Sequence, residues 1–133
     1  MCGILCCSSN SELPDLFSLL KEIEFRGPDN SGSFISGGRF NFLGHVRLSI
    51  IDTLSRSNQP MGDSSNRYII VYNGEIYNFV DLKRYLETKY EFFAWKTSSD
   101  TEVIIEGFAR EGRRFLRKLN GFFSLVIFDQ LTD

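Results

Sequence analysis

The sequence predicts an α+β or layered α/β protein that is rich in antiparallel strands. Short β-favouring runs are separated by Gly, Asn and Pro, which interrupt strands and form turns. Apolar residues at helical spacing recur between these runs, before residue 24, around residue 82 and between residues 103 and 119. The length of 133 residues fits a single domain.

The first part of the chain predicts a strand, a helix and a loop. Residues 2–8 form a short apolar run that is typical of a buried strand. Ser11 is a suitable N-cap, and Pro14 lies near the first turn, for a helix over residues 13–24. Residues 26–32 are rich in residues that break regular structure, so they predict a loop.

The next part is predicted to be mostly β. Residues 33–36 and 39–45 predict two strands joined by Gly37-Gly38, a dipeptide typical of two-residue hairpins. Residues 46–52 are a further β-rich run. The polar segment 53–62 predicts turns.

The second half predicts helices between two strands. Residues 68–72 favour a strand that Asn73-Gly74 breaks, and residues 79–86 mark a short helix. Residues 122–129 are apolar almost throughout, as expected of a strand covered on both faces. The segment between residues 86 and 122 begins with a predicted loop and helix cap at Ser98-Ser99-Asp100. A helix around residues 103–108, a break at Gly112 and a short helix around residues 115–119 follow.

Composition restricts the possible partners. The net charge of −2 and the pI near 5.4 give no basic footprint for nucleic acid. No apolar run reaches the ~18 residues of a membrane span, and the first residues do not resemble a signal peptide, so we expect no membrane partner and a cytoplasmic location. A local basic cluster predicts only a solvated helix face: Arg110, Arg113, Arg114, Arg117 and Lys118, interrupted by Glu111.

The cysteines and the histidine exclude some kinds of site. Three cysteines, an odd number, make a poor disulfide framework. Cys6 and Cys7 are expected to be small residues in or near the core. No Cys/His spacing indicates a metal site. His45 is the single histidine, so a histidine-based catalytic triad has one candidate.

Cys2 is the candidate nucleophile. Removal of Met1 would expose a cysteine that carries both a thiol and a free α-amine. A thiolate is a strong nucleophile, and an amine that titrates at roughly 7.7–8.0 in model peptides can serve as its base. One residue then supplies nucleophile and general base, in the way an N-terminal threonine does.

Four segments together carry a resemblance to a known family. In chain order they are Met1-Cys2-Gly3-Ile4, Arg26-Gly27-Pro28-Asp29, Arg47-Leu48-Ser49-Ile50-Ile51-Asp52 and Asn73-Gly74-Glu75-Ile76-Tyr77-Asn78. They resemble the class II glutamine amidotransferase domain of glutamine-dependent asparagine synthetases, which belongs to the N-terminal-nucleophile hydrolases. The resemblance runs from Cys2 to the last residue. It implies a four-layer sandwich in which helices cover two packed antiparallel sheets.

The resemblance implies a catalytic role for three residues. Cys2 would attack the side-chain amide of glutamine, and hydrolysis of the resulting thioester would release glutamate after ammonia has left. Asn73 and Gly74 match the oxyanion hole, which uses one side-chain amide and one backbone N–H. A plain Asn-Gly turn is the alternative for this pair. Arg26 is a weaker candidate, for ordering the pocket.

Other matches concern the two charges of free glutamine. Arg47 matches the residue that binds the α-carboxylate, although a surface arginine on a strand fits the same pattern. Glu75 and Asp100 match groups near the α-ammonium, Asp100 by direct pairing, and a helix cap is the other interpretation of Asp100. The pocket wall and its backbone contacts are matched by residues that core packing explains equally well: Leu48, Ile50 and Ile51.

The resemblance covers only part of the family's architecture. In the family the domain continues with a Gly-Arg-Asp segment and a synthetase domain, so we interpret residues 2–133 as a C-terminally truncated amidotransferase domain. A Ser-Gly-Gly-Xaa-Asp-Ser loop is absent from the sequence. ATP and magnesium are therefore expected only in the synthetase domain, and no cofactor is expected here. Glutamine and a synthetase domain in cis are the expected partners, and the family implies a homodimer.

The residues leave three functions open. The preferred one is the glutaminase half of an asparagine-synthetase-type enzyme, whose ammonia serves the ATP-dependent amidation of aspartate in the full-length enzyme. A second is an amidotransferase domain that serves another acceptor. The third is a truncated remnant that acts as a binding module without catalysis.

Overall fold

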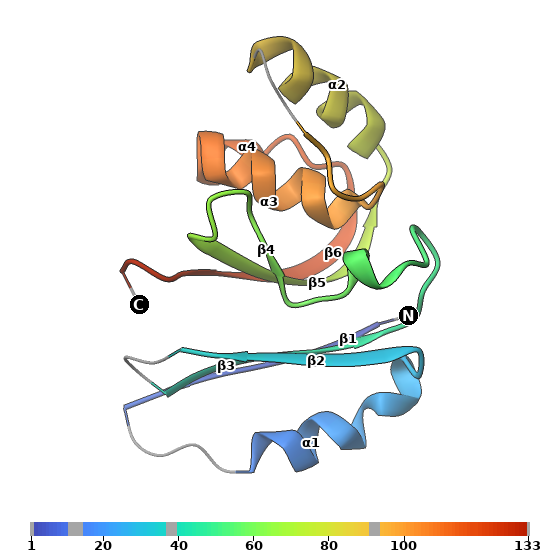
Figure 1. Cartoon of the computed structure of the whole chain (residues 1–133), viewed down its shortest axis with the longest axis vertical. Helices are drawn as coiled ribbons and strands as arrows, with labels where there is room; N and C mark the ends of the chain where they lie inside the picture. The colour runs from blue at the N-terminus through green and yellow to red at the C-terminus, as the bar shows by residue number, and fades with distance from the viewer. Residues whose placement is uncertain (1, 11–14, 37–39, 91–93, 133) are drawn as a thin grey trace.

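Two antiparallel sheets lie face to face, and helices cover both outer faces (Figure 1). The computed structural model describes residues 2–10, 15–36, 40–90 and 94–132. The layers follow the chain, since residues up to 47 form the first sheet with its helix and residues from 61 onward form the second. The predicted α+β four-layer arrangement is confirmed.

Sheet A is the first of the two sheets. Side chains alternate along a strand, so Phe42 and Val46 point outward, where they pack against α1. Alternate residues, His45 and Arg47, point toward the other sheet. In spatial order the strands are β1 (Gly3–Ser9), β3 (Phe40–Arg47) and β2 (Asn30–Ile35), and the outer face carries α1 (Leu16–Glu22) followed by the 3-10 turn η1 (Glu24–Arg26).

Sheet B carries the larger core on its outer face. Ile70, Tyr72 and Ile76 share one side of the central strand and pack beneath the helices. Burial of this apolar surface, at roughly 25 cal/mol per Å², is the main term that stabilises the layer. In spatial order the strands are β4 (Met61–Gly62), β5 (Tyr68–Ile76) and β6 (Gly121–Asp129), and the helices are α2 (Phe79–Lys89), α3 (Asp100–Glu111) and α4 (Arg113–Leu116).

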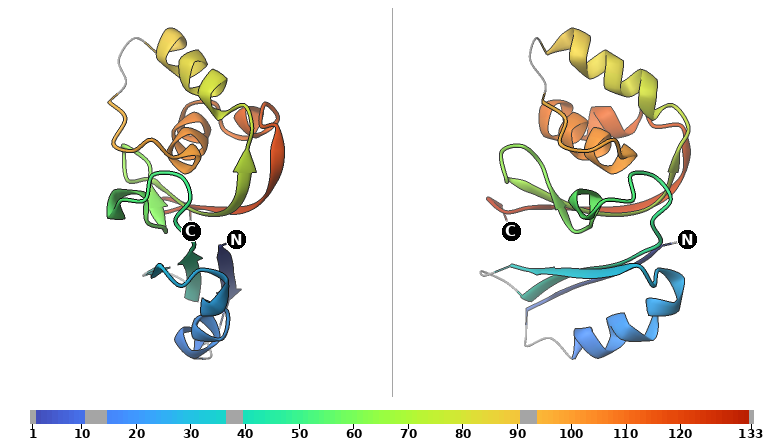
Figure 2. Two further views of the ribbon diagram at one scale, coloured as in Figure 1. Left: turned by 90° about the vertical axis from the view of Figure 1, so that its right-hand side faces the viewer. Right: turned by 45° about the vertical axis from the view of Figure 1, so that its right-hand side comes forward.

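Residues 48–60 connect the two sheets. They contain the 3-10 turn η2 (Ser55–Ser57) and a cis peptide bond between Gln59 and Pro60. The connection passes close to the N-terminus, at the end of the sandwich where β1 begins (Figures 1 and 2). The start of the chain and the middle of the chain therefore meet at one end of the two sheets.

The helices of the second half follow the sequence pattern. α2 contains the predicted segment 79–86, and Gly112 separates α3 from α4 as expected. Ser99 is the N-cap of α3, because its side chain accepts a hydrogen bond from the backbone N–H of Glu102. Asp100 is therefore a first-turn residue of α3 and is not its cap.

The first helix is shorter than predicted. α1 begins at Leu16, and its N-cap is Asp15, whose side chain accepts a hydrogen bond from the backbone N–H of Ser18 at 3.1 Å. The predicted cap at Ser11, with Pro14, lies outside the described residues. So does the predicted Gly37-Gly38 turn.

Two boundaries in sheet A correct the prediction. β2 begins at Asn30, so the loop predicted over residues 26–32 is too long. β3 ends at Arg47, and the strand predicted over residues 46–52 is wrong beyond that point. A side chain explains the difference, since backbone carbonyls of this segment accept hydrogen bonds from the Arg47 guanidinium. Those carbonyls need no partner strand.

In sheet B, the break predicted at Asn73-Gly74 is also wrong. β5 continues through both residues, and Gly74 pairs with Phe123 in the antiparallel ladder with β6. An Asn-Gly dipeptide favours a turn when no partner strand competes for its backbone. Here the nine-residue ladder with β6 provides that partner.

β6 and β1 are less covered than predicted. Phe122 and Phe123 are 51% and 39% exposed, so β6 is not covered on both faces. It is an edge strand of sheet B within the described ranges.

Cys6 was expected in or near the core but is exposed, whereas Cys7 packs partly buried against the core beneath α1.

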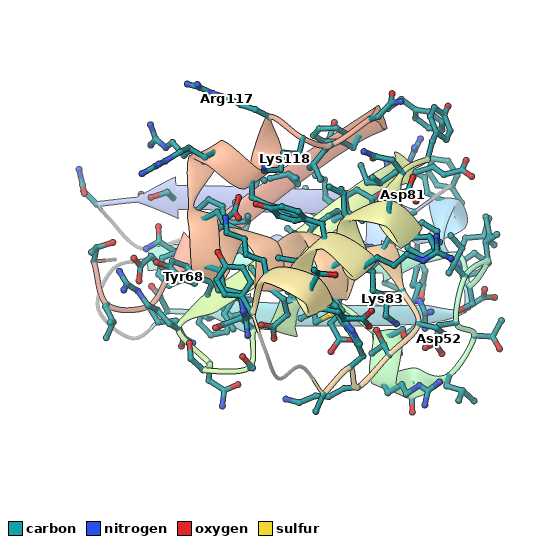
Figure 3. The ribbon with its side chains drawn as sticks, turned by 90° about the horizontal axis from the view of Figure 1, so that it is seen from above. Asp52, Tyr68, Asp81, Lys83, Arg117 and Lys118 are labelled. Atoms are coloured by element: carbon teal, nitrogen blue, oxygen red, sulfur yellow. The ribbon has the colours of Figure 1, made fainter. Side chains whose placement is uncertain are left out.

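The basic cluster lies on the outer surface of the helical layer, as predicted. Figure 3 looks down on this layer, and Arg117 extends outward from it. Glu111 is the local counter-ion: it lies 2.7 Å from the ammonium of Lys89 and 3.9 Å from that of Lys118. The hydrogen bond from Lys89 lowers the pKa of Glu111 to about 2. Part of the positive charge is therefore neutralised within the surface itself.

Candidate active site

One cavity of about 180 Å³ joins the start of β1, the end of β3, the segment after it, the middle of β5 and the start of α3. It is lined by every residue predicted for the site: Cys2, Arg47, Leu48, Ile50, Ile51, Asn73, Gly74, Glu75 and Asp100. Arg26 is not among the lining residues. It donates from Nε to the backbone carbonyl of Cys2 at 3.2 Å, so it fixes the start of β1.

The thiol of Cys2 lies against the backbone of Leu48. The N–H of Leu48 donates to Sγ at 3.3 Å, and Sγ lies 3.6 Å from the carbonyl oxygen of the same residue. The backbone of Leu48 therefore fixes the position of the sulfur on both sides. Cys2 is half-buried and faces the cavity. Met1, whose removal would expose the α-amine of Cys2, lies outside the described residues.

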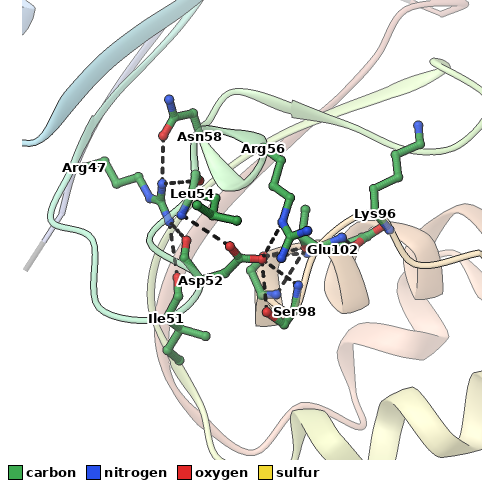
Figure 4. A network of polar contacts seen from close by, with 11 residues as sticks. Arg47, Ile51, Asp52, Leu54, Arg56, Asn58, Lys96, Ser98 and Glu102 are labelled. Carbon is green, nitrogen blue, oxygen red and sulfur yellow. Dashed lines mark hydrogen bonds and ion pairs between the residues drawn. The ribbon is translucent and has the colours of Figure 1, made fainter.

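The buried guanidinium of Arg47 holds the segment that follows β3 (Figure 4). It donates to the carbonyl oxygens of Ile51 at 3.2 Å and Leu54 at 3.1 Å, to that of Asp52, and to Oδ1 of Asn58 at 2.8 Å. All four acceptors are neutral. Within the described part of the chain, no carboxylate lies at ion-pair distance from Arg47, and a buried charge without a counter-ion is costly. This side of the cavity therefore favours an anion.

Asp52 links the same segment to the residues before α3. Its carboxylate accepts hydrogen bonds from the backbone N–H of Ser98 at 2.8 Å, from the Ser98 hydroxyl at 3.0 Å and from Nε of Arg56 at 3.2 Å (Figure 4). These bonds, that from the Ser98 N–H above all, hold the pKa of Asp52 well below its usual range. Arg47 also binds the backbone carbonyl of Asp52. Asp52 therefore connects Arg47 to Ser98, which lies just before α3.

Asp100 is buried in the first turn of α3. Its Oδ2 accepts hydrogen bonds from the hydroxyl of Tyr72 at 2.7 Å and from the backbone N–H of Ile76 at 3.4 Å. Burial raises the pKa of Asp100, and these hydrogen bonds act in the opposite direction. No ion pair to Asp100 is found among the described residues. The cavity thus contains a buried cation and a buried anion that are not paired with each other.

Asn73, Gly74 and Glu75 follow one another along β5. Alternation places Asn73 and Glu75 toward sheet A, whereas Tyr72 lies on the helical side. Asn73 is half-buried, and Glu75 is exposed. The absence of a side chain at Gly74 allows β6 to approach β5 closely, because a Cβ there would lie 2.3 Å from the carbonyl oxygen of Phe122.

The sequence interpretation missed several lining residues. Gln59 is one of them: its Oε1 accepts from the backbone N–H of Tyr72 at 2.6 Å, and its Nε2 donates to the hydroxyl of Thr101 at 3.3 Å. A glutamine in a turn-like segment carries no signal of such a role. Tyr72 was easier to find, since it directly precedes Asn73-Gly74. The missed lining residues are Ser57, Gln59, Tyr72, Ser99, Thr101 and Phe122.

His45 forms no catalytic triad. Its Nε2 lies 3.2 Å from the carbonyl oxygen of Tyr72, so this nitrogen carries the proton, and Nδ1 has no hydrogen-bond partner in the described structure. Burial lowers the pKa of His45 to about 4, so the ring is neutral at pH 7. The histidine therefore joins the two sheets and does not act on Cys2.

Two other kinds of site have no support. Within the described ranges, no three His, Cys, Asp or Glu side chains lie close enough together to hold a metal ion. None of the helices described here is long and apolar enough to cross a membrane.

Comparison with known proteins agrees with these features. A family described as "Glutamine amidotransferase domain" matches residues 1–133. The glutamine-hydrolyzing asparagine synthetase of Brassica oleracea is 37% identical over 134 residues, which cover 97% of this chain and 22% of that protein. A putative asparagine synthetase of Methanocaldococcus jannaschii is 38% identical over 130 residues, which cover 83% of this chain and 24% of that protein. The chain thus spans less than a quarter of the length of these relatives.

A solved structure shows the same fold. Glutamine phosphoribosylpyrophosphate amidotransferase from B. subtilis superposes with a TM-score of 0.70 at 22% sequence identity, over 84% of this chain and 31% of that chain. At this identity the likeness concerns the fold alone. It agrees with the predicted sandwich, in which helices cover two packed antiparallel sheets.

Proposed function

This chain belongs to the glutamine amidotransferase domain family, and from that premise we propose that it hydrolyses glutamine to glutamate and ammonia through a thioester on Cys2. One observation carries the proposal: a nucleophile shares a cavity with two buried, oppositely charged groups that are not paired. Arg47 favours an anion nearby, and Asp100 favours a cation. Free glutamine offers an α-carboxylate and an α-ammonium, whereas a glutamine side chain within a peptide offers neither.

The proposed reaction begins when the Cys2 thiolate attacks the amide carbon of the glutamine side chain. The α-amine, once Met1 is removed, takes the thiol proton and gives it to the leaving nitrogen, so ammonia departs and a thioester remains. Water then attacks the thioester with the same amine as base. Glutamate leaves, and the thiol reforms. The Leu48 N–H, 3.3 Å from Sγ, holds the sulfur in place during the first step.

The oxyanion formed in both steps would be held by the Asn73 side-chain amide and the Gly74 N–H. Such a donor contributes about 3–4 kcal/mol when it is fixed in advance. The pairing of β5 with β6 fixes Gly74, and the bond from Tyr72 to Gln59 fixes the residue before Asn73. Glu75 would add negative charge near the substrate α-ammonium. The apolar wall beside the substrate methylenes would be Leu48, Ile50 and Ile51.

We further propose that the ammonia serves the ATP-dependent amidation of aspartate in a longer protein. The support is that relatives covering this chain are named asparagine synthetases and that the chain spans only 22% and 24% of two of them. Sites for ATP, magnesium and aspartate would then lie in the remaining part. A different acceptor would leave the chemistry at Cys2 unchanged.

The test is intact mass before and after incubation with 6-diazo-5-oxo-norleucine, a glutamine mimic whose diazo ketone alkylates the nucleophile. We expect loss of Met1, one adduct on Cys2, and glutamate release from glutamine. Cys2→Ala should lose both adduct and activity, whereas Cys6→Ala, which removes an exposed thiol, should keep both. Hydrolysis by Cys2→Ala would refute Cys2 as the nucleophile, and a processed chain that forms no adduct and releases no glutamate would favour the binding module instead.

A further inference from the structure

Tyr72 has a position in the site that the predicted mechanism does not use. Its hydroxyl donates to Oδ2 of Asp100 at 2.7 Å, its N–H donates to Oε1 of Gln59 at 2.6 Å, and its carbonyl oxygen lies 3.2 Å from Nε2 of His45. Tyr72 itself is only 3% exposed. Both backbone polar groups and the hydroxyl thus have buried side-chain partners, which hold this residue from three directions.

We propose that Tyr72 is a positioning residue that aims the Asp100 carboxylate at the α-ammonium of the substrate. This inference rests on the proposed function. The Tyr72 hydroxyl and the Ile76 N–H bind the same oxygen, Oδ2, and so restrict rotation of the carboxylate. Both donors come from β5, the strand that carries Asn73. The anion that selects the substrate and the donor that stabilises the oxyanion are therefore held by one strand.

The hydroxyl has a chemical reason to be present. Packing alone would be satisfied by phenylalanine, because the ring belongs to the core between sheet B and the helices. A buried hydroxyl is costly unless it is bonded, and a hydrogen bond to a charged group is about twice as strong as one between neutral groups. Burial, followed by the charge on Asp100, raises the pKa of Tyr72, so the hydroxyl keeps its proton and remains the donor.

The charge on Asp100 depends on several neighbours. Arg47 and Glu75, which carry opposite charges, line the same cavity as Asp100. Glu102, on the same helix, is turned to the backbone N–H groups of Lys96 and Thr97. Among the described residues, the other titratable side chains that line the same cavity are those of Cys2, Arg47 and Glu75. The Tyr72 hydroxyl is a neutral donor that points at the Asp100 carboxylate. Its hydrogen bond favours the ionised form of Asp100.

The experiment compares Tyr72→Phe with Tyr85→Phe. Tyr85 is a matched control, because its hydroxyl also donates to a carboxylate, Oε1 of Glu111 at 2.6 Å, but outside the cavity. Each variant is assayed with glutamine and with glutaramate, the analogue that lacks the α-amino group. Tyr72→Phe should raise KM for glutamine about tenfold, the effect of one hydrogen bond to a charged group. Its kcat should change by less than about twofold.

The two substrates separate positioning from general damage. Glutaramate has no α-ammonium, so Tyr72→Phe should leave its kcat/KM unchanged, and the preference for glutamine over glutaramate should fall about tenfold. Tyr85→Phe should keep the preference of the parent chain. A preference unchanged in Tyr72→Phe overturns the inference, whatever the stability of the variant.

Failure of the proposed function gives a different result. If the parent chain hydrolyses neither compound, that function is wrong, and the role of Tyr72 is tested without substrate by a 13C NMR titration of the Asp100 carboxyl group. Loss of the hydroxyl should raise the pKa of Asp100 in Tyr72→Phe, whereas Tyr85→Phe should leave it as in the parent. The same Asp100 titration in all three chains would refute the inference.

Discussion

Nε2 of His45 lies 3.2 Å from the carbonyl oxygen of Tyr72, and this contact joins sheet A to sheet B one residue before Asn73. A neutral imidazole donates here from the centre of the sandwich. The strand that carries the proposed oxyanion donors is thus tied directly to the strand that ends at Arg47. The protonation state of this one histidine affects how well the two sheets fit.

The free energy of unfolding should therefore depend on pH through His45. Burial lowers the folded-state pKa of His45 from 6.5 to about 4, so the unfolded chain binds more protons between these values. Stability should fall as pH falls through this window, by up to roughly 3 kcal/mol. His45→Gln keeps an N–H donor but does not titrate. Urea unfolding at pH 7 and pH 4 should show a smaller pH effect in the variant, and an equal effect would contradict this account.

Asp52→Asn should weaken substrate binding and stability together. The amide cannot replace the carboxylate as acceptor for both Ser98 and Arg56, and the expected destabilisation is about 1–3 kcal/mol. KM for glutamine should rise, because the Arg47 side and the start of α3 lose their connection. The folded-state pKa of Asp52 is lowered, so its contribution is present above its unfolded pKa and is lost as pH falls below that value.

The control for that variant is Asp81→Asn. Asp81 has an 80% exposed side chain and a single weak ion pair with Arg84 at 3.8 Å. Asp81→Asn should therefore leave both KM for glutamine and the melting temperature unchanged. Equal effects of the two substitutions would mean that charge alone, and not the Asp52 bridge, determines the result.

Asn73→Ala should reduce kcat and leave KM for glutamine almost unchanged. The amide would act on the oxyanion, which exists only in the transition state and intermediate, and removal of one such donor costs about 10²–10³ in kcat. Steady-state glutaminase kinetics measure the effect. Asn10→Ala, at an exposed position, is the control and should behave as the parent chain. A rise in KM with kcat intact would assign Asn73 to ground-state binding.

Gly74→Ala should disrupt the pairing of β5 with β6. The added Cβ would lie 2.3 Å from the carbonyl oxygen of Phe122 and 2.6 Å from Cα of Phe123, so backbone must move. Such overpacking costs about 1–3 kcal/mol or more. Gly62→Ala is the control, because its nearest neighbour is the side-chain oxygen of Asn66 at 3.3 Å. Thermal unfolding compares the two, and equal melting temperatures would show that β6 is easily displaced.

The site was largely predictable from sequence because its key residues lie in short local motifs. Cys2, Arg47 and Asn73 each lie within a run of distinctive neighbours, and the cavity brings these runs together. Gln59 and Tyr72 were not predicted. Their roles depend on which distant segment packs against them, and no local pattern of a single sequence carries that information.

The fold shows the same limit. Helices α2 and α3 follow their apolar spacing, since a helix satisfies its backbone locally. Strand boundaries depend on partners: β5 passes through Asn73-Gly74 because β6 pairs with it, and β3 stops because Arg47 binds the carbonyls beyond it. The exposure of Phe122 could not be predicted either, because apolar composition does not reveal which face another element covers.

The division of the sandwich along the chain has a consequence for synthesis. The strands of sheet A that the structure describes lie within residues 3–47, so they leave the ribosome before the described strands of sheet B. β5 must then wait for β6, which follows three helices later. The cavity takes residues from both sheets, so it closes only after β6 has paired. Cys2 precedes every described strand of sheet B in the chain, so a nascent chain carries this thiol well before it has a pocket to act in.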